Sequence, residues 1–365
     1  MGAVDTSTPP PAAPQSKLRA GGRRLQPNEI RGLVAMAIVL VIALAVLPAI
    51  LSVYWVTVLT AVAYISVTAL GLNLLMGRVG LVSLGQIAVL AMGAWIFSKL
   101  SFSTGLPYPI VLILTGLITM VLGTLVGLPA LRLSGLYLAL ITLMLAGAIT
   151  IALRTMQFPN GGPGFLGNDP NSSAAVRRPA IAMTDPAFFR YTVVVCLIMF
   201  LLALWHVRGK AGHGWAAIRQ SEPAALAAGV NITLYKLWAF ALASFMTGVA
   251  GGLMASDVGR LYAISFPTDK SIVLLAVVLM GGIYSLWGAL IAGAFYSLLP
   301  ALLNDWGLPA DLLTILFGIG IIQVLLTAPG GLAQQFPRDM KNLGKLIMRL
   351  FRRSSAPPDD GRAPA

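Results

Sequence analysis

The sequence predicts an all-α fold, a polytopic transmembrane helical bundle of about ten spans with a cytoplasmic coupling helix. Of the 365 residues, 58% are hydrophobic and only 10% are charged, whereas an average soluble domain is about 45–50% apolar and about 25% charged. The apolar residues also fall in runs of about 17–25, the length that crosses a bilayer as a helix. Such a chain cannot cover a wet surface with polar side chains, which excludes a soluble enzyme, a disordered protein and a coiled coil.

The basic residues gather in two tails, which indicates how the chain is oriented. Of the 25 Lys and Arg, five fall in residues 1–31 and seven in 336–365. We expect 1–31 to be a disordered basic cytoplasmic tail, because it has no periodic apolar pattern. Residues 32–332 are the transmembrane domain, and 333–365 are a second basic cytoplasmic tail. Within that tail, 340–353 has the pattern of an amphipathic helix on anionic lipid, with a disordered tail as the alternative.

Ten apolar runs account for the region between the tails. The first, 33–51, is too long and starts too late to be a signal peptide. The runs that follow are 53–76, 79–100, 108–131, 133–153, 191–207, 234–255, 272–286, 287–303 and 312–328. An even total returns the C-terminal basic cluster to the cytoplasm, as the positive-inside rule requires. The same parity places 208–236 in the cytoplasm and 154–190 outside.

Two of the runs carry glycines four residues apart, Gly123 with Gly127 and Gly248 with Gly252. The spacing puts both glycines of a pair on one helix face, where the missing side chains let another helix approach closely. We therefore predict that these two spans pack tightly inside the bundle.

Enzyme motifs are missing from the chain. It has no phosphate-binding GxxxxGK[ST] loop and no HExxH. Cys196 stands alone, and His206 and His213 have no acidic or thiol partner nearby, so no metal site and no cofactor are expected. The spans also lack the Asp, Glu and Lys residues that ion-driven carriers use. Either another subunit supplies the energy or the protein is a passive pore.

The segment 208–233, between the sixth and seventh runs, has the pattern of a short surface helix. Ser221 suits its N-cap, Glu222 its first turn and Gly229 its C-terminal stop. An Ala-rich helix at this place could dock into a groove of a neighbouring protein, or it could simply connect two spans. The residues proposed for coupling to a partner are Ser221, Glu222, Ala224, Ala225 and Gly229.

Polar residues and paired glycines inside the runs are the candidates for a translocation path. They are Asn73, Ser83, Gln86, Gly281 and Gly282. Ser83 and Gln86 lie three residues apart, which would place them on one face of the third span. There they need either an interhelical or a pore-lining partner. Gly281 and Gly282 interrupt an apolar run, which indicates a hinge or a re-entrant bend beside the path.

Five motifs occur in order along the chain. They are GLNLLMGRVGLVSLGQ at 71–86, LRLSGLYLA at 131–139, NGGPG at 160–164, the segment ending in GVNIT at 229–233, and GIYSLWG at 282–288. Together they resemble the motifs of LivM-type permeases of branched-chain amino-acid ABC importers. The chain departs from that pattern at Gln86, where the family has His, at 220–223, where it has an acidic pair, and at Ala289, where it has Pro.

The resemblance implies a permease subunit of an ATP-binding-cassette importer in the bacterial inner membrane, which moves branched-chain amino acids by alternating access. It implies as partners a homologous permease subunit, two ATP-binding subunits that dock at 208–233, a periplasmic amino-acid-binding protein and membrane lipid, but no nucleic acid. ATP hydrolysis would take place in the partner subunits. A urea or short-amide permease of the same family is one alternative, and a passive channel or an ion-coupled carrier is another.

Overall fold

The computed structural model describes residues 44, 47–130, 135–164, 166–169, 172, 174–307, 315, 318 and 319. The chain divides into two units, 1–46 and 47–365, and the fold described below is that of the second. The two predicted tails, 1–31 and 333–365, lie outside the described residues, as do most of the first and last predicted spans.

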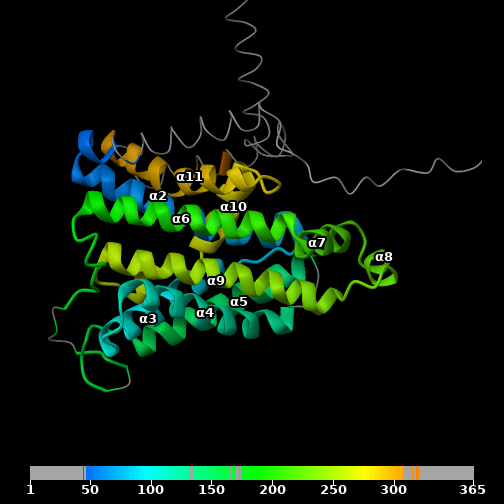
Figure 1. The fold of residues 1–365 in the computed structure, drawn as a ribbon, viewed down its shortest axis with the longest axis horizontal. Coiled ribbons are helices and arrows are strands. Elements are labelled where there is room, and N and C mark those ends of the chain that lie inside the picture. The colour runs from blue at the N-terminus through cyan, green and yellow to red at the C-terminus, as the bar shows by residue number, and fades with distance from the viewer. Residues whose placement is uncertain are drawn as a thin grey trace, which may run out of the picture. The chain divides into compact units, whose positions relative to one another are not determined.

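Every regular element in the described part of the chain is a helix (Figure 1). The elements are α2 (Val53–Asn73), the π-helix η1 that continues it (Leu74–Val79), α3 (Gln86–Ser103), α4 (Tyr108–Ala130), α5 (Gly135–Met156), α6 (Asp185–Arg208), α7 (Lys210–Gln220), α8 (Glu222–Ala227), α9 (Ile232–Val258), the 3-10 turn η2 (Ala263–Ser265), α10 (Lys270–Gly281) and α11 (Leu286–Asp305). Eight helical stretches in these residues are long and apolar enough to cross a membrane. The protein is therefore a multi-pass membrane protein, as predicted.

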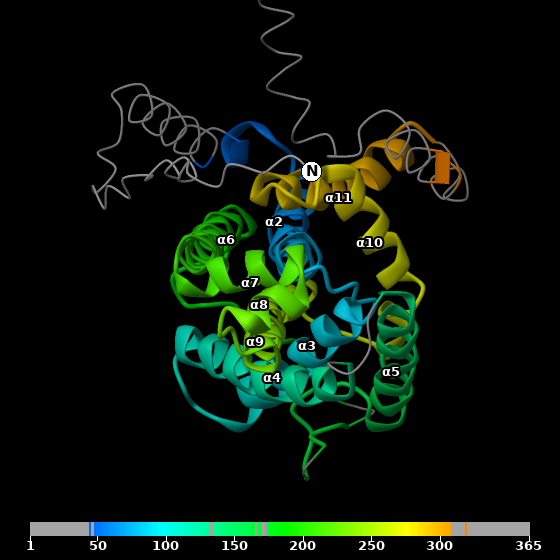
Figure 2. The same cartoon turned by 90° about the vertical axis from the view of Figure 1, so that its right-hand side faces the viewer.

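Helix α9 lies at the centre of the bundle, where it packs along α2, α3 and α4 (Figure 2). Glycines allow this close approach. A Cβ atom on Gly248 would lie 2.5 Å from Cβ of Thr119 in α4, and one on Gly93 of α3 would lie 2.7 Å from Cα of Gly248. A side chain on Gly123 would likewise overlap Ser244 of α9. The predicted tight packing of the two GxxxG spans is confirmed.

Helix α2 is the second buried helix, and the hairpin of α10 and α11 packs against it. A Cβ atom on Gly293 of α11 would overlap the hydroxyl of Ser66 in α2. Within the hairpin, a Cβ on Gly281 would overlap the carbonyl oxygen of Gly288, so the two helices meet backbone to backbone. Helix α10 has 12 residues and is about 18 Å long, short of the roughly 30 Å of a bilayer core, so it reaches spanning length only together with η2, as the 19-residue stretch Ala263–Gly281.

Two predicted span starts are wrong by several residues. The third span begins at Gln86 rather than 79, because Gly80 takes a left-handed conformation (φ 86°) that ends η1 and leaves 80–85 non-helical. The sixth begins at Asp185, because a helix tolerates the charged Arg190 that interrupts the apolar run. Helix α11 continues through Pro300, as membrane helices do when neighbouring groups satisfy the freed backbone.

Helices α4, α5 and α6 turn large apolar side chains outward. The exposed residues on these three helices include Ile113, Val121, Leu125, Tyr137, Met144, Ile151, Ile198, Leu201 and Trp205. In a water-soluble monomer, a continuous apolar surface of this kind would promote aggregation. In a membrane, it is the surface that meets lipid or another membrane subunit.

The two large connections lie at opposite ends of the bundle. Helices α7 and α8 are at one end and the segment 157–184 is at the other (Figure 1). We call them the coupling end (209–231) and the loop end (157–184). This arrangement agrees with the charge parity of the sequence, which requires these two segments on opposite sides of the membrane.

The packing of α9 predicts a contrast between two helical glycines. Gly248→Ala should destabilise the protein by about 1–3 kcal/mol, the usual cost of overpacking, because its Cβ would press on Thr119. Gly147→Ala in α5 should be neutral or stabilising, because a Cβ there meets nothing within 4 Å and Ala favours the helix. Thermal unfolding of both purified variants measures the difference. Equal melting temperatures would contradict the assigned packing.

Candidate functional site

Helices α7 and α8 form the surface of the coupling end, and α8 has the two ends that the sequence predicts. The hydroxyl of Ser221 caps it by accepting a hydrogen bond from the backbone N–H of Ala224 (3.4 Å). At the other end, Gly229 takes a left-handed conformation (φ 79°). The N–H of Val230 then donates to the carbonyl of Ala225 (3.0 Å), which completes a Schellman motif.

Helix α8 is the most exposed element of the coupling end. Ala225 is the buried residue of this helix, and it faces the bundle. Ala224 and Gly229 are exposed, and the Leu226 side chain is 63% exposed. The outward surface is therefore a narrow ridge of small residues with one large apolar side chain.

Glu222 is held by a buried lysine at the start of α9. Its Oε1 accepts a hydrogen bond from Nζ of Lys236 at 2.7 Å. The Lys236 side chain is only 5% exposed, and a buried ammonium without a partner would be costly. Glu222 thus fixes α8 to α9, a role the sequence analysis missed. The signal for it was a lysine just inside a predicted span.

Helix α7 is anchored on α9 by a buried tryptophan. The Trp215 side chain is fully buried, and its indole N–H donates to the carbonyl of Tyr235 at 2.8 Å. A Cβ atom on Gly214 would overlap the Tyr235 ring, so the two helices pack closely here. Both helices of the coupling end are therefore attached to the start of α9, at Tyr235 and Lys236.

Arg219 connects α7 to two further elements. Its Nη1 donates to the carbonyl of Gly77 in η1, and its guanidinium lies 4.4 Å from the ring centroid of Tyr284, in the turn between α10 and α11. Such a cation over an aromatic face is an attractive contact. A Cβ on Gly77 would overlap the carbonyl of Ile283, so η1 and that turn also touch directly. The sequence analysis did not single out Arg219.

Asn73, at the end of α2, holds the same turn. Its Nδ2 donates to the carbonyls of Gly282 (3.1 Å) and Ser285 (3.0 Å), and the residue is fully buried. The structure thus brings two of the predicted path residues, Asn73 and Gly282, together in one contact. The neighbouring predicted path residue, Gly281, lies against Gly288 within the α10–α11 hairpin.

Ser83 and Gln86 line one small cavity, but not as the sequence predicts. Ser83 lies in the non-helical segment before α3, so the expected shared helix face is wrong. Gln86 donates from Nε2 to the hydroxyl of Thr247 in α9. The cavity measures about 20 Å³ and is bounded also by Thr142 and Ser244. That volume holds about one water molecule, not an amino acid.

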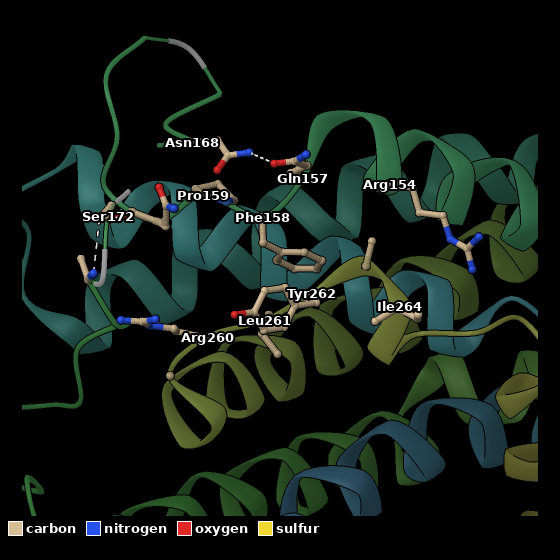
Figure 3. A pocket seen from close by; sticks show the side chains of 14 residues that line it. Arg154, Gln157, Phe158, Pro159, Asn168, Ser172, Arg260, Leu261, Tyr262 and Ile264 are labelled. Atoms are coloured by element: carbon tan, nitrogen blue, oxygen red, sulfur yellow. Dashed lines mark hydrogen bonds between the residues drawn. The ribbon is translucent and has the colours of Figure 1, made fainter. Parts of the chain in front are cut away.

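A larger pocket, of about 430 Å³, lies at the loop end (Figure 3). Phe158, Leu261 and Tyr262 gather in its middle, and Arg154 and Arg260 lie on either side of them (Figure 3). The lining residues come from the end of α5 with the segment after it, and from the segment after α9. The sequence alone could not bring these two segments together, because they lie about a hundred residues apart.

Arg178 fixes the loop end to two helices. Its guanidinium forms ion pairs with Asp185 at the start of α6 (2.6 Å) and with Asp257 near the end of α9 (3.8 Å). It also lies 4.9 Å from the ring centroid of Phe188. Arg178 is therefore one of several contacts that tie the long loop to the bundle, together with the N–H of Val176, which donates to the carbonyl of Gly259 (2.8 Å).

The single cysteine and the two histidines do not gather. Cys196 is buried in α6. The ring of His206 lies between Trp205 and Trp238, and its Nδ1 donates to the carbonyl of Leu202. Among the described residues, no group of three or more His, Cys, Asp or Glu could hold a metal ion.

Sequence comparisons identify relatives of the chain. The family described as "Branched-chain amino acid transport system / permease component" matches residues 54–325. Two relatives are named "High-affinity branched-chain amino acid transport system permease protein LivM". The one from Salmonella typhimurium is 29% identical and the one from Escherichia coli 28%, each over 286 residues that cover 73% of this chain and 67% of the relative. No solved structure gives a significant match. The family match covers most of the chain, and this multi-pass membrane protein therefore belongs to the family of branched-chain amino acid transport permeases.

Proposed function

We propose that this chain is one transmembrane permease subunit of an ATP-driven importer that carries branched-chain or other hydrophobic amino acids across the bacterial inner membrane. Membership of the permease family and the names of its two relatives support the substrate class. A homologous permease, two ATP-binding subunits and a periplasmic amino-acid-binding protein would complete the importer. The domain 32–332 would be the permease, with both tails in the cytoplasm.

The observation that carries this proposal is the construction of α8, which is exposed on one face and fixed to the bundle on the other. Ser221, Glu222 and Ala225 hold the helix through its cap, its ion pair and its buried face. Ala224 and Gly229 remain on the outward ridge. Of the five predicted coupling residues, these two would touch an ATP-binding subunit, whose groove the narrow ridge could enter.

We place the coupling end in the cytoplasm because its connection is short and basic. Arg208, Lys210 and Arg219 lie there, and the acidic Glu222 is paired with Lys236. The positive-inside rule is strongest for short connections. At the loop end the connection is longer, and Arg178 is neutralised by two aspartates.

The route by which docking could move the spans leads through Arg219. Motion of α7 and α8 would pull on Gly77 in η1 and on Tyr284 in the α10–α11 turn. Asn73 couples that turn to the end of α2, so α2 and the hairpin would respond together. Single-turn π-helices often mark functional sites within helices, and interrupted helices are common at the centre of transporters.

The path itself would open at the small cavity beside Ser83 and Gln86. This cavity lies where α3, α4, α5 and α9 meet. Among the described elements, α5 packs mainly against α3, α4 and η2, so it is the helix that could separate from the others at least cost. In the arrangement described here the cavity is closed to an amino acid.

A bulky residue on the α8 ridge tests the docking. Ala224→Trp should reduce co-purification of the ATP-binding subunit, and ATP-driven leucine uptake in proteoliposomes, by at least tenfold, because the indole would block a close contact. Ala174→Trp, an equally exposed site at the loop end, is the matched control and should retain the ATP-binding subunit. Uptake that persists without any ATP-binding subunit would instead indicate a channel, and faster uptake of urea than of leucine would indicate the amide substrate class.

A pair of changes at Tyr284 tests the route through Arg219. Tyr284→Leu removes the aromatic face, so ATP hydrolysis should continue while uptake per ATP falls severalfold. Tyr284→Phe keeps a ring for the guanidinium and should transport almost normally. Uptake and hydrolysis are measured in the same proteoliposomes. If both variants transport alike, Arg219 does not couple through this ring.

Two substitutions, one at each partner of the hydrogen bond between Gln86 and Thr247, test whether Gln86 lines the path. Thr247→Val and Gln86→Leu both remove the bond between α3 and α9, so both should lower stability by about 0.6 kcal/mol, the average for interhelical bonds in membranes. Only Gln86 lines the cavity, so only Gln86→Leu should also change the uptake rate, or the ranking of leucine, isoleucine and valine. Equal transport by the two variants would mean that Gln86 only joins helices.

A further inference from the structure

A second concave site lies at the coupling end, on the other side of α7 from α8. It measures about 480 Å³ and is bounded by the end of α2 with η1, the end of α6, and α7. Its lining residues are Gly77, Arg78, Val207, Gly212, His213, Ala216, Arg219 and Gln220. We call this site the basic pocket. Its residues lie within the family match, and Gly77 and Arg219 also belong to the proposed coupling route, but the docking ridge does not line it.

The ionisable side chains that line the basic pocket are all basic. Arg78, His213 and Arg219 line it, and none of its described lining residues is acidic. The nearest acid along the chain, Glu222, is paired with Lys236 in a different hollow. Two guanidinium groups that share a pocket repel one another, so a site of this composition gains most by taking up an anion.

The donors of the basic pocket are not used up within the protein. Nε of Arg78 is buried and has no hydrogen-bond partner among the described residues, so the protein itself does not satisfy this donor. His213 donates from Nδ1 to the carbonyl of Gly209 (2.9 Å), and in the neutral ring Nε2 is then an acceptor, so the donors left for an anion are those of the guanidinium groups. Guanidinium groups are well suited to phosphate, because their N–H groups match two oxygens at once.

Exposed tryptophans near the basic pocket indicate that it lies at the level of the lipid headgroups. Trp205 is 71% exposed on α6, two residues before the lining residue Val207. Trp287 is 53% exposed in the first turn of α11, three residues after the Tyr284 that Arg219 covers. Exposed tryptophans of membrane proteins gather at the level of the headgroups. A soluble partner would instead be expected at the projecting α8.

We propose that the basic pocket binds the phosphate of an anionic lipid headgroup in the cytoplasmic leaflet. Arg78 and Arg219 hold its oxygens, and Gln220 and His213 complete the polar lining. Basic pockets between spans on the cytoplasmic side are suited to such headgroups. Because Arg219 also contacts Gly77 and Tyr284, a bound phosphate steadies the connection between α7 and the spans. The site is independent of which solute the protein carries.

Lipid titration of the full-length chain tests the proposal without any ATP-binding subunit or transport assay. The purified protein in mild detergent is titrated with short-chain phosphatidylglycerol or, separately, phosphatidylcholine, and bound lipid is counted by native mass spectrometry. We expect saturable binding of phosphatidylglycerol at least tenfold tighter than that of phosphatidylcholine. A parallel titration with inorganic phosphate distinguishes a lipid from a soluble anion. Displacement of the lipid by millimolar phosphate would overturn the lipid assignment.

A matched pair at one exposed position supplies the control. Ala216→Glu places a carboxylate in the pocket and should weaken phosphatidylglycerol binding at least tenfold, whereas Ala216→Gln, of the same size and uncharged, should stay within about threefold. Arg78→Gln should act like Ala216→Glu, and Lys210→Gln, which removes an equal charge outside the pocket, should have little effect.

Three further outcomes would overturn the proposal. One is equal binding by Ala216→Glu and Ala216→Gln, and another is equal binding of the two lipids. The third is unchanged lipid binding by Arg78→Gln, which would mean that this guanidinium does not hold the headgroup. Failure of any of these tests leaves the transport proposal untouched, because none of them measures uptake.

Discussion

Close backbone contact between α9 and its neighbours holds this bundle together, and that contact depends on glycine. In lipid there is little hydrophobic gain when two apolar helices meet, so packing and interhelical hydrogen bonds must supply the attraction. Gly93 of α3 and Gly248 of α9 bring two backbones into contact, and Gly123 of α4 leaves room for the side chain of Ser244 in α9. The exposed apolar faces of α4, α5 and α6 follow from this, because the small residues face inward and the large ones are left for the lipid side.

A small set of polar side chains joins different elements of the bundle. Asn73 holds the α10–α11 turn, Gln86 binds Thr247, and Lys236 holds Glu222. At each end of the bundle an arginine joins separate elements: Arg178 at the loop end and Arg219 at the coupling end. Since an unpaired polar group costs several kcal/mol in an apolar medium, these few contacts specify how the helices are arranged.

Local patterns in the sequence predicted the helices, the ends of α8 and the tight pair of GxxxG spans, because run length, capping residues and glycine spacing each act within a few residues. They did not predict the non-helical segment before α3, the π-helix η1 or the role of Arg219. The Arg219 contact joins residues 142 positions apart, and the loop-end pocket joins two segments separated by four helices. Such contacts depend on how the helices pack, and a short stretch of sequence carries no information about that packing. The candidate path residues show the same limit: Ser83 and Gln86 do share a cavity, but through a bend rather than a common helix face.

The π-helix at the end of α2 sets the register between the spans and the coupling end. A π-turn holds one more residue than an α-turn, so η1 amounts to a single-residue insertion near the end of a buried helix. Each residue of an α-helix turns by about 100°, and the insertion therefore decides which carbonyl faces α7. It presents Gly77 to Arg219 and to Ile283, two partners that a regular helix of the same sequence would aim elsewhere. A relative that gains or loses one residue here would keep the helix but change which groups it contacts. The number of residues at this point therefore matters as much as their identity.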